Sequence, residues 1–404
     1  MTKRKTGVWL IGALGSVATT VVVGSIAFGK GLISSAGMIT AVNDFDGLEL
    51  VDIADLEFGG CDIRKGNIYD SARHLFAENM SIDRRILDEI ETDLMQMGNS
   101  VCPGTARNCG EEILNLTDFH NEKISLREEI SRLRDHLRLF RKNRKLDDVV
   151  VVNLASTEPL LDFQYGNIDL DTLEGYLDEN NAGSVRASTL YAYAAIQEGC
   201  PFINFNPSNA ALTPALVQLA RQQGVPVMGN DGKTGETLVK SALAPMFTCR
   251  NLDVMSWEGF NILGNMDGKV LNHPANRETK IRTKDQTLKK ILGYAPHSKV
   301  GIDYVPSLGD QKTAWDYIHF RGFLGVPMSL QFVWQGYDSI LAAPLVLDLV
   351  RLAEFAKREG EAGLMPHLAL FFKSPLDVDE HRLSKQFDAL IAYVNSAKAN
   401  NKDR

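Results

Sequence analysis

The sequence lacks the surplus of basic residues that general nucleic-acid binding requires. It holds 43 Lys and Arg against 51 Asp and Glu, a formal net charge of -8 at pH 7. Because nucleic-acid binders normally present a basic surface to the phosphate backbone, this balance predicts no nucleic-acid partner. It remains compatible with a local basic pocket for an anionic small molecule.

Cysteine is scarce, and no two cysteines have the CxxC spacing of redox or zinc motifs. The segment CPGTARNC at 102–109 leaves a metal-binding pair and unpaired thiols as alternatives. An odd number of cysteines in a long chain fits a reducing, cytoplasmic setting. The five are Cys61, Cys102, Cys109, Cys200 and Cys249.

The N-terminal apolar run, GVWLIGALGSVATTVVVGSIAFG, has no A-x-A cleavage site of the kind that follows a secretory signal. The run follows basic residues and is long enough to span a bilayer, so a membrane anchor is one alternative. Its glycines and hydroxyl residues favour a soluble interpretation instead. We expect a buried strand at 8–11, a tight turn at 12–15 and a helix over 16–27.

No repeat, low-complexity stretch or proline-rich linker divides the 404 residues, although a chain of this length normally forms two domains. Up to about residue 240, expected strands alternate with helical stretches, which predicts an α/β fold with a doubly wound parallel sheet. The run of four valines at 149–152 is typical of a central strand. Further strands are expected at 48–51, 201–205 and 225–228, and helices within 69–98 and 111–146.

The pattern changes near residue 245, where short alternating segments such as 300–305 and 328–334 begin. They predict a second, α+β domain built on an antiparallel sheet. Helices at 340–360 and 380–398 are expected to return to the first domain. The expected division is therefore 1–244, 245–338 and 339–404.

Several residues are placed to carry chemistry, each with a plainer alternative. The turn GALGSVA suits a phosphate at a helix N-terminus or simple helix–sheet packing, but it is not the usual GxGxxG, and no clean acidic residue ends a second strand at the usual spacing. Arg277, Lys280 and Lys284 would share one helix face, for an anion or for solvent. Lys312 is expected where a strand meets a helix, and Lys373 within a strand-like apolar run, LALFF. Turn-associated acids, which would orient lysines, hold a cation or cap turns, are Asp231, Asp267, Asp310 and Asp338.

These residues occur in an ordered set of segments that resembles the myo-inositol-1-phosphate synthase family, in its shorter, prokaryote-like form. The set covers most of residues 7–375. The segments are WLIGALGSVATT, STLYAYAAIQEGCPFINFNPSN, GNDGKTGETLVKS, LGNMDGKVL, NRETKIRTKD, YVPSLGDQKTAWD, YDSILAAPLVLDL and FFKSPL.

The resemblance implies a Rossmann-type NAD domain interrupted by a catalytic and oligomerisation domain. It implies catalytic roles for Lys280, Lys284, Lys312, Lys373, Asp231, Asp310 and Asp338. Cofactor contacts are implied for Gly12, Ala13, Leu14, Gly15, Ser16, Val17, Asp62, Asp231 and Asp338. Substrate contacts are implied for Thr234, Gly235, Glu236, Asn265, Asp267, Lys280, Lys284 and Lys312. Two positions depart from the family: Cys61 replaces a tryptophan before Asp62, and Glu236 replaces a glutamine.

The implied reaction is an NAD-dependent isomerisation of glucose 6-phosphate to inositol phosphate, by a cytoplasmic homotetramer that needs no membrane. Oxidation at C5 allows loss of a C6 proton, aldol closure onto C1 follows, and reduction then restores the cofactor. Lysines suit the proton transfers and the developing oxyanions. For stabilisation of the enolate, a divalent cation, a monovalent cation and the lysine charges alone are all open alternatives. An NAD-dependent sugar- or polyol-phosphate dehydrogenase is the main alternative, and a non-catalytic or membrane-associated relative is the other.

Overall fold

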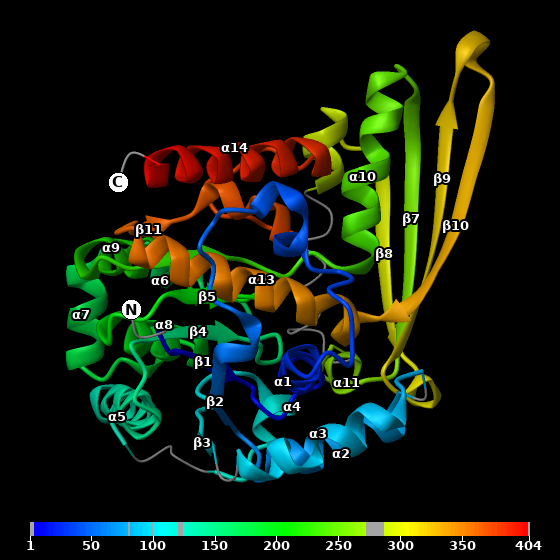
Figure 1. Ribbon diagram of the computed structural model, residues 1–404. Helices are drawn as coiled ribbons and strands as arrows, with labels where there is room; N and C mark the ends of the chain where they lie inside the picture. Colours follow the sequence, from blue (N-terminus) through cyan, green and yellow to red (C-terminus); the bar gives the residue numbers. More distant parts are fainter. Residues whose placement is uncertain (1–3, 80, 98–99, 120–123, 272–286, 403–404) are drawn as a thin grey trace.

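Two β-sheets organise the molecule, one inside a rounded α/β body and one standing at its side (Figure 1). The computed structural model describes residues 4–79, 81–97, 100–119, 124–271 and 287–402. Lys280 and Lys284 therefore lie outside the described residues, as does Arg277.

The first sheet has seven strands in the order β11-β6-β5-β4-β1-β2-β3, and every neighbouring pair is parallel. β4 is buried along its whole length, as the valine run predicts. Order and direction confirm the doubly wound α/β prediction. The strands are β1 Thr6–Ile11, β2 Leu56–Asp62, β3 Val101–Pro103, β4 Asp148–Asn153, β5 Phe202–Asn204, β6 Pro226–Gly229 and β11 Gly363–Leu364.

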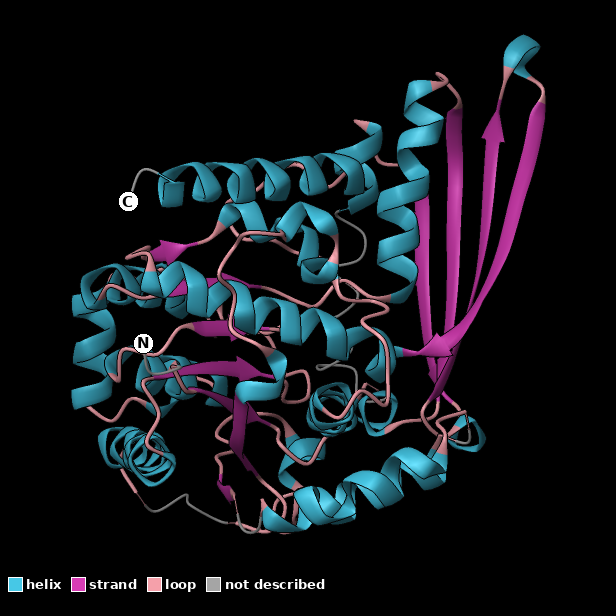
Figure 2. Ribbon diagram, viewed as in Figure 1, coloured by secondary structure: helices cyan, strands magenta, loops and turns pink. Residues whose placement is uncertain are grey.

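Helices cover both faces of this sheet (Figure 2). On one face α1 packs against the long α13, and the side chains of α2 and α3 join the same core. On the other face α5, α7, α8 and α9 cover the alternate residues of β1 and β4. The helices are α1 Ser16–Gly29, α2 Ile68–Glu78, α3 Arg84–Gln96, α4 Glu111–Leu114, α5 Leu126–Arg144, α6 Phe163–Gly166, α7 Leu170–Asp178, α8 Ala187–Gln197, α9 Pro214–Gln223 and α13 Asp338–Arg358.

Two expectations for this part of the chain are wrong. Residues 48–51 form no strand; the second strand is β2, which pairs in parallel with β1. The single long helix expected over 111–146 is instead the short α4 and the separate α5. Among the described residues, none of the helices combines the length and apolar composition needed to cross a bilayer.

The second sheet has the order β10-β9-β7-β8 and is mixed, because β7 and β8 run parallel. This corrects the expected antiparallel sheet, although β9 does pair antiparallel with both β7 and β10. Trp257 and Phe247 are fully buried where α10 covers one face of the sheet. The elements are β7 Asp253–Leu263, β8 His297–Tyr304, β9 Gln311–Arg321, β10 Pro327–Tyr337, α10 Gly235–Cys249 and α11 Met266–Val270.

After β10 the chain returns to the first sheet through α13 and β11, which pairs with β6. A 3-10 helix, η7 Pro366–Phe371, and α14 Leu383–Lys402 complete the chain, and α14 packs on η7. The second sheet thus begins after residue 249 and ends at residue 337. The division at 244 and 338 remains a prediction, since α10 runs across the first boundary.

Gly60 is a sensitive point of the fold, because a Cβ there would meet the backbone oxygen of Leu10 at 2.1 Å. We expect Gly60→Ala to lower the free energy of unfolding by about 2 kcal/mol or more, since backbone must shift. Gly24→Ala is the control: a Cβ there meets nothing within 4 Å, inside α1. It should raise stability by about 0.5–1 kcal/mol. Thermal unfolding of both variants checks the pair, and equal midpoints would contradict it.

Candidate active site

The turn between β1 and α1 is shaped for a close-approaching ligand. Gly12 has a φ of +79°, and a Cβ on it would lie 3.0 Å from the backbone of Ala155. The N–H groups of Gly12 and Ala13 both donate to the carbonyl of Cys61, and Gly15 stands at the N-cap of α1. The N-terminus of α1 therefore borders the cavity lined by Gly12, Gly15 and Ser16, and such a helix N-terminus suits a dinucleotide pyrophosphate.

Asp62 is the last residue of β2 and only 3% exposed. Its Oδ2 accepts a hydrogen bond from the Leu14 N–H at 2.9 Å, and its Oδ1 accepts one from the Arg64 N–H at 3.0 Å. Asp62 thus ends the second strand, but it lies much further along the chain than the usual ~20 residues after the glycine turn, so no acid stands at the usual spacing. The strand that carries Asp62 differs from the one expected at 48–51.

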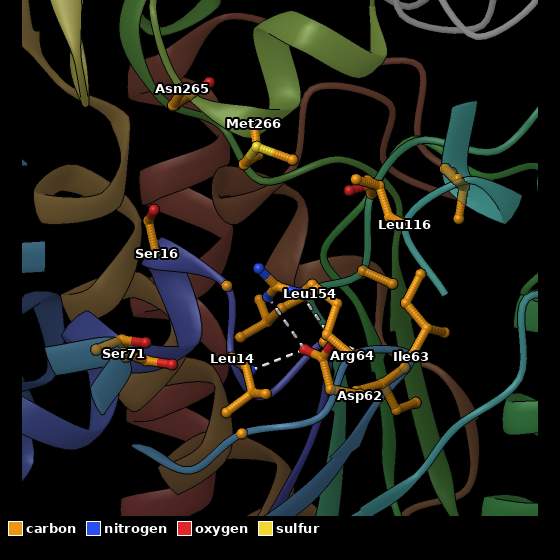
Figure 3. A pocket seen from close by; sticks show the side chains of 18 of the residues that line it. Leu14, Ser16, Asp62, Ile63, Arg64, Ser71, Leu116, Leu154, Asn265 and Met266 are labelled. Carbon is orange, nitrogen blue, oxygen red and sulfur yellow. Dashed lines mark hydrogen bonds and ion pairs between the residues drawn. The ribbon is translucent and has the colours of Figure 1, made fainter. Parts of the chain in front are cut away.

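A cavity of about 670 Å³ lies at the carboxyl ends of the first sheet's strands. Figure 3 shows Leu14, Asp62 and Arg64 together in it, with Asn265 and Met266 away from them. Of the predicted cofactor residues, Ala13 is buried and Val17 packs toward the core. Those that line the cavity are Gly12, Leu14, Gly15, Ser16 and Asp62, joined by the predicted Asn265 and Asp310.

Asp231 and Lys373 meet across two chain segments that pair antiparallel. The Lys373 Nζ donates to the Asp231 Oδ1 at 2.8 Å, and both residues are at least nine-tenths buried. The Lys373 N–H also donates to the Asp231 carbonyl at 2.6 Å, and Asp231 has a φ of +64°. The first four residues of the run LALFF belong to η7, and Phe372 forms only an isolated bridge with Gly232, so the expected strand is wrong. The apolar side chains of this run pack in the core.

Lys312 and Asp338 form a second ion pair at the foot of the second sheet. The Lys312 Nζ lies 3.2 Å from the Asp338 Oδ2, and the Thr234 hydroxyl donates to the Asp338 Oδ1 at 3.2 Å. A Cβ on Gly235 would lie 3.3 Å from the Lys312 Nζ, so the turn before α10 sits directly against this pair. The prediction that a helix begins at Lys312 is wrong, because this residue lies at the start of β9.

Asp310 lies next to this pair and accepts a hydrogen bond from the Ser339 hydroxyl at 2.6 Å. Burial raises the pKa of Asp310, and the charges of Asp338 and Glu78 add to the rise, while hydrogen bonds from Ser339 and Asn265 oppose it. A carboxyl group poised in this way can hold a proton above its ordinary range.

The side chain of Glu236 is buried and bonded to other protein side chains. Its Oε1 lies 2.5 Å from the Nζ of Lys240, its Oε2 accepts from the Asn261 amide at 2.6 Å, and all three side chains are buried. A substrate contact by Glu236 remains a prediction. For Asp267 the structure describes the backbone in α11 but not the side chain.

A line of three asparagines, which the sequence pattern did not predict, crosses the ends of β4, β5 and β6. The Asn153 amide donates to the Asn204 Oδ1 at 2.9 Å, and the Asn204 amide donates to the Asn230 Oδ1 at 2.6 Å. These bonds anchor the residue that precedes Asp231. The signal was present, because Asn153 and Asn204 each end an apolar strand.

Lys233 was also missed, although it lies inside the quoted GNDGKTG segment. Its side chain is 3% exposed and donates to the Gln386 side chain on α14. Burial lowers the pKa of Lys233 to about 7. Neighbouring His381 is also affected, its pKa being lowered to about 4 by burial and then by Lys290 and Lys233.

Together the fold and the cavity define a Rossmann-type dinucleotide-binding protein with a lysine–carboxylate site beside the dinucleotide cavity. Within the described residues, no three His, Cys, Asp or Glu side chains gather as they would around a metal ion. The chain belongs to the myo-inositol-1-phosphate synthase family, an NAD-binding family whose sequence model matches residues 6–394.

Known relatives agree with this membership. The chain is 36% identical to inositol-3-phosphate synthase 1 of Bacteroides thetaiotaomicron, over 93% of this chain and 90% of that protein. The crystal structure of inositol-3-phosphate synthase from Caenorhabditis elegans matches with a TM-score of 0.86 at 25% identity, over 98% of this chain and 86% of that one. A synthase-related protein from Thermotoga maritima matches with a TM-score of 0.80 at 25% identity, over 97% and 99%.

The lowered pKa of Lys233 predicts that the free energy of unfolding depends on pH. Because its pKa is lowered from 10.5 to about 7 on folding, the folded chain binds fewer protons between these values, and stability rises with pH there. We expect the unsubstituted protein to gain about 2 kcal/mol between pH 7 and pH 9 relative to Lys233→Met. Denaturant unfolding of both proteins at several pH values measures this difference. Parallel stability curves would contradict the assignment.

Proposed function

We propose that this chain converts D-glucose 6-phosphate into 1D-myo-inositol 3-phosphate, with NAD regenerated in each turnover. The observation that carries the proposal is the presence of two lysine–carboxylate pairs, the buried Lys373–Asp231 and the partly buried Lys312–Asp338, on either side of one turn of the chain. The Lys312–Asp338 pair lies directly against Thr234 and Gly235. Asp231 of the other pair precedes the same turn in the chain. Cyclisation of a flexible sugar phosphate needs such groups at fixed separations.

The cofactor site fits a dinucleotide by its own geometry. The turn at Gly12 has no room for a side chain, the N-terminus of α1 offers backbone N–H groups, and Asp62 stands at the end of β2. When bound, NAD would supply hydride acceptance and return at C5 of the substrate. We assign Gly12, Leu14, Gly15, Ser16 and Asp62 to holding it, with Ala13 and Val17 supporting the turn.

The lysines are assigned by their partners. Lys373, oriented by Asp231, and Lys280 would move the proton at the C5 oxygen. Lys312, oriented by Asp338, and Lys284 would bind the phosphate or the C1 oxygen and stabilise the enolate. The backbone of Thr234 and Gly235 starts α10 and would bind the phosphate. Asn265, Asp267, Asp310 and Glu236 complete the proposed site.

We further propose a cytoplasmic homotetramer whose product supplies inositol for phospholipid synthesis. The support for assembly is an apolar strip across the free face of the second sheet. Phe260 and Val333 are each the cross-strand partner of Trp315, and all three are more than two-fifths exposed. Such a strip is typical of a subunit interface.

Incubation of the purified protein with glucose 6-phosphate and catalytic amounts of NAD tests the main proposal. Inositol phosphate should form without build-up of NADH. Parallel assays with added Mg²⁺ or K⁺ test the cation. Stoichiometric NADH without a cyclised product would identify a sugar-phosphate dehydrogenase and refute the isomerase.

We expect Lys312→Ala and Lys373→Ala each to lower kcat by about 10² or more, because a positioned proton donor contributes roughly that factor. Lys385→Ala is the matched control, since this lysine is 57% exposed and pairs with Asp388 on the surface of α14. Its kcat should stay within about twofold, because an exposed pair contributes little. Normal turnover by Lys312→Ala would refute the role of that lysine.

The apolar strip predicts that Trp315→Glu or Val333→Glu dissociates the assembly. A carboxylate placed in a buried apolar interface must be desolvated without a partner. Light scattering after size-exclusion chromatography should show a smaller mass than for the unsubstituted protein. Leu139→Glu, at an exposed position on α5, is the control and should leave the mass unchanged.

A further inference from the structure

Near the end of β2 lie two side chains, one of which favours NAD and the other NADP in sites of this type. In Rossmann-type sites an acid at this point accepts a hydrogen bond from the ribose 2′-hydroxyl of NAD, whereas a nearby arginine accommodates the 2′-phosphate of NADP. This chain has both, because Arg64 follows Asp62 by two residues. Both also line the cavity (Figure 3).

The two side chains are bonded to each other. The Arg64 Nε donates to the Asp62 Oδ1 at 3.1 Å and its Nη2 donates to the Oδ2 at 3.4 Å, besides the backbone N–H bond. The Asp62 carboxylate is buried and is also fixed by Leu14, whereas the Arg64 side chain is 36% exposed. The anion is therefore held in place, and the cation is the partner that is able to move.

A second cation, Lys65, also lines the cavity, but its side chain lies over the ring of Phe119. The Lys65 Nζ lies 5.8 Å from the centre of the Phe119 ring, and its backbone N–H donates to Asp118 at 2.7 Å. Arg64 is thus the cation that the structure places on the Asp62 carboxylate.

We propose that the charge of Asp62 alone makes the site selective for NAD, and that Arg64 is a latent ligand for a 2′-phosphate. The inference rests on the proposed use of a dinucleotide. With Asp62 ionised, a 2′-phosphate would meet a like charge in a buried place, which disfavours NADP strongly. Without that charge the guanidinium is released, and its planar donors match phosphate oxygens bidentately.

Asp62→Asn is the informative variant, because the remaining amide oxygen can still accept from the Leu14 N–H. Titration calorimetry with NAD⁺ and with NADP⁺ measures binding without any need for turnover. We expect Asp62→Asn to bind NADP⁺ at least about tenfold more tightly than the unsubstituted chain does, and NAD⁺ more weakly. Asp62→Asn/Arg64→Leu should lose the gain, and Asp62→Asn/Lys65→Leu should keep it.

The inference is overturned if Asp62→Asn shows no gain in affinity for NADP⁺, or if that gain survives the added Arg64→Leu substitution. Normal NAD⁺ binding by the unsubstituted chain would in that case still support the proposed cofactor. Binding of neither dinucleotide by the unsubstituted chain would refute the proposed cofactor, and this inference with it. Thermal unfolding checks each variant, and Asp62→Ser replaces Asp62→Asn if the latter does not fold.

Discussion

The ion pair between Asp231 and Lys373 is the constraint on which the arrangement of the site depends. The two residues are 142 positions apart, and the whole second sheet lies between them in the chain. A buried ion pair is tolerated only when its geometry is held accurately, because both charges have lost their hydration. Here the position of the pair is fixed by backbone hydrogen bonds between residues 230–233 and 371–374. The line of asparagines that ends at Asn230 adds a further hydrogen bond.

The strands of the second sheet extend away from the region of this ion pair (Figure 1). β9 begins at the foot of the sheet and β10 ends there, with Lys312 directly opposite Gly336 in their register. The residues that reach the site therefore come from one end of the strands. The other end carries Phe323 and Leu324, both more than four-fifths exposed, far along the same hairpin. Lys312 and the exposed apolar residues of the hairpin thus lie at opposite ends of a single pair of strands.

The sequence predicted those parts of the fold that depend on local pattern. The valines of β4, the glycine turn at Gly12 and the helix α13 all follow from spacing and composition. β2 was hidden because Gly59 and Gly60 depress strand propensity, and the apolar segment at 48–51 looked more like a strand. A Cβ on Gly60 would collide with the neighbouring backbone, so tertiary packing requires the residue that the local pattern disfavours.

The assignment of the candidate site residues depends on the family resemblance. Spacing alone indicated that Lys312 and Lys373 stand near turns, but their partners come from other segments of the chain. Lys312 was assigned to a helix because Gly309 and Asp310 resemble a helix start, whereas the alternating residues after it pair with two strands. Lys233 passed unnoticed because its burial depends on α14, which lies more than 150 residues further along.

The return of α13 and β11 to the first sheet also governs how the chain is assembled during synthesis. α13 covers the face formed by β1 and β4, and β11 adds the last edge strand beside β6. The ribosome must therefore synthesise the entire second sheet before α13 can cover its part of that face. Until then the apolar side chains that pack against α13 are open to water, and such long-range completion is slow and prone to association between nascent chains.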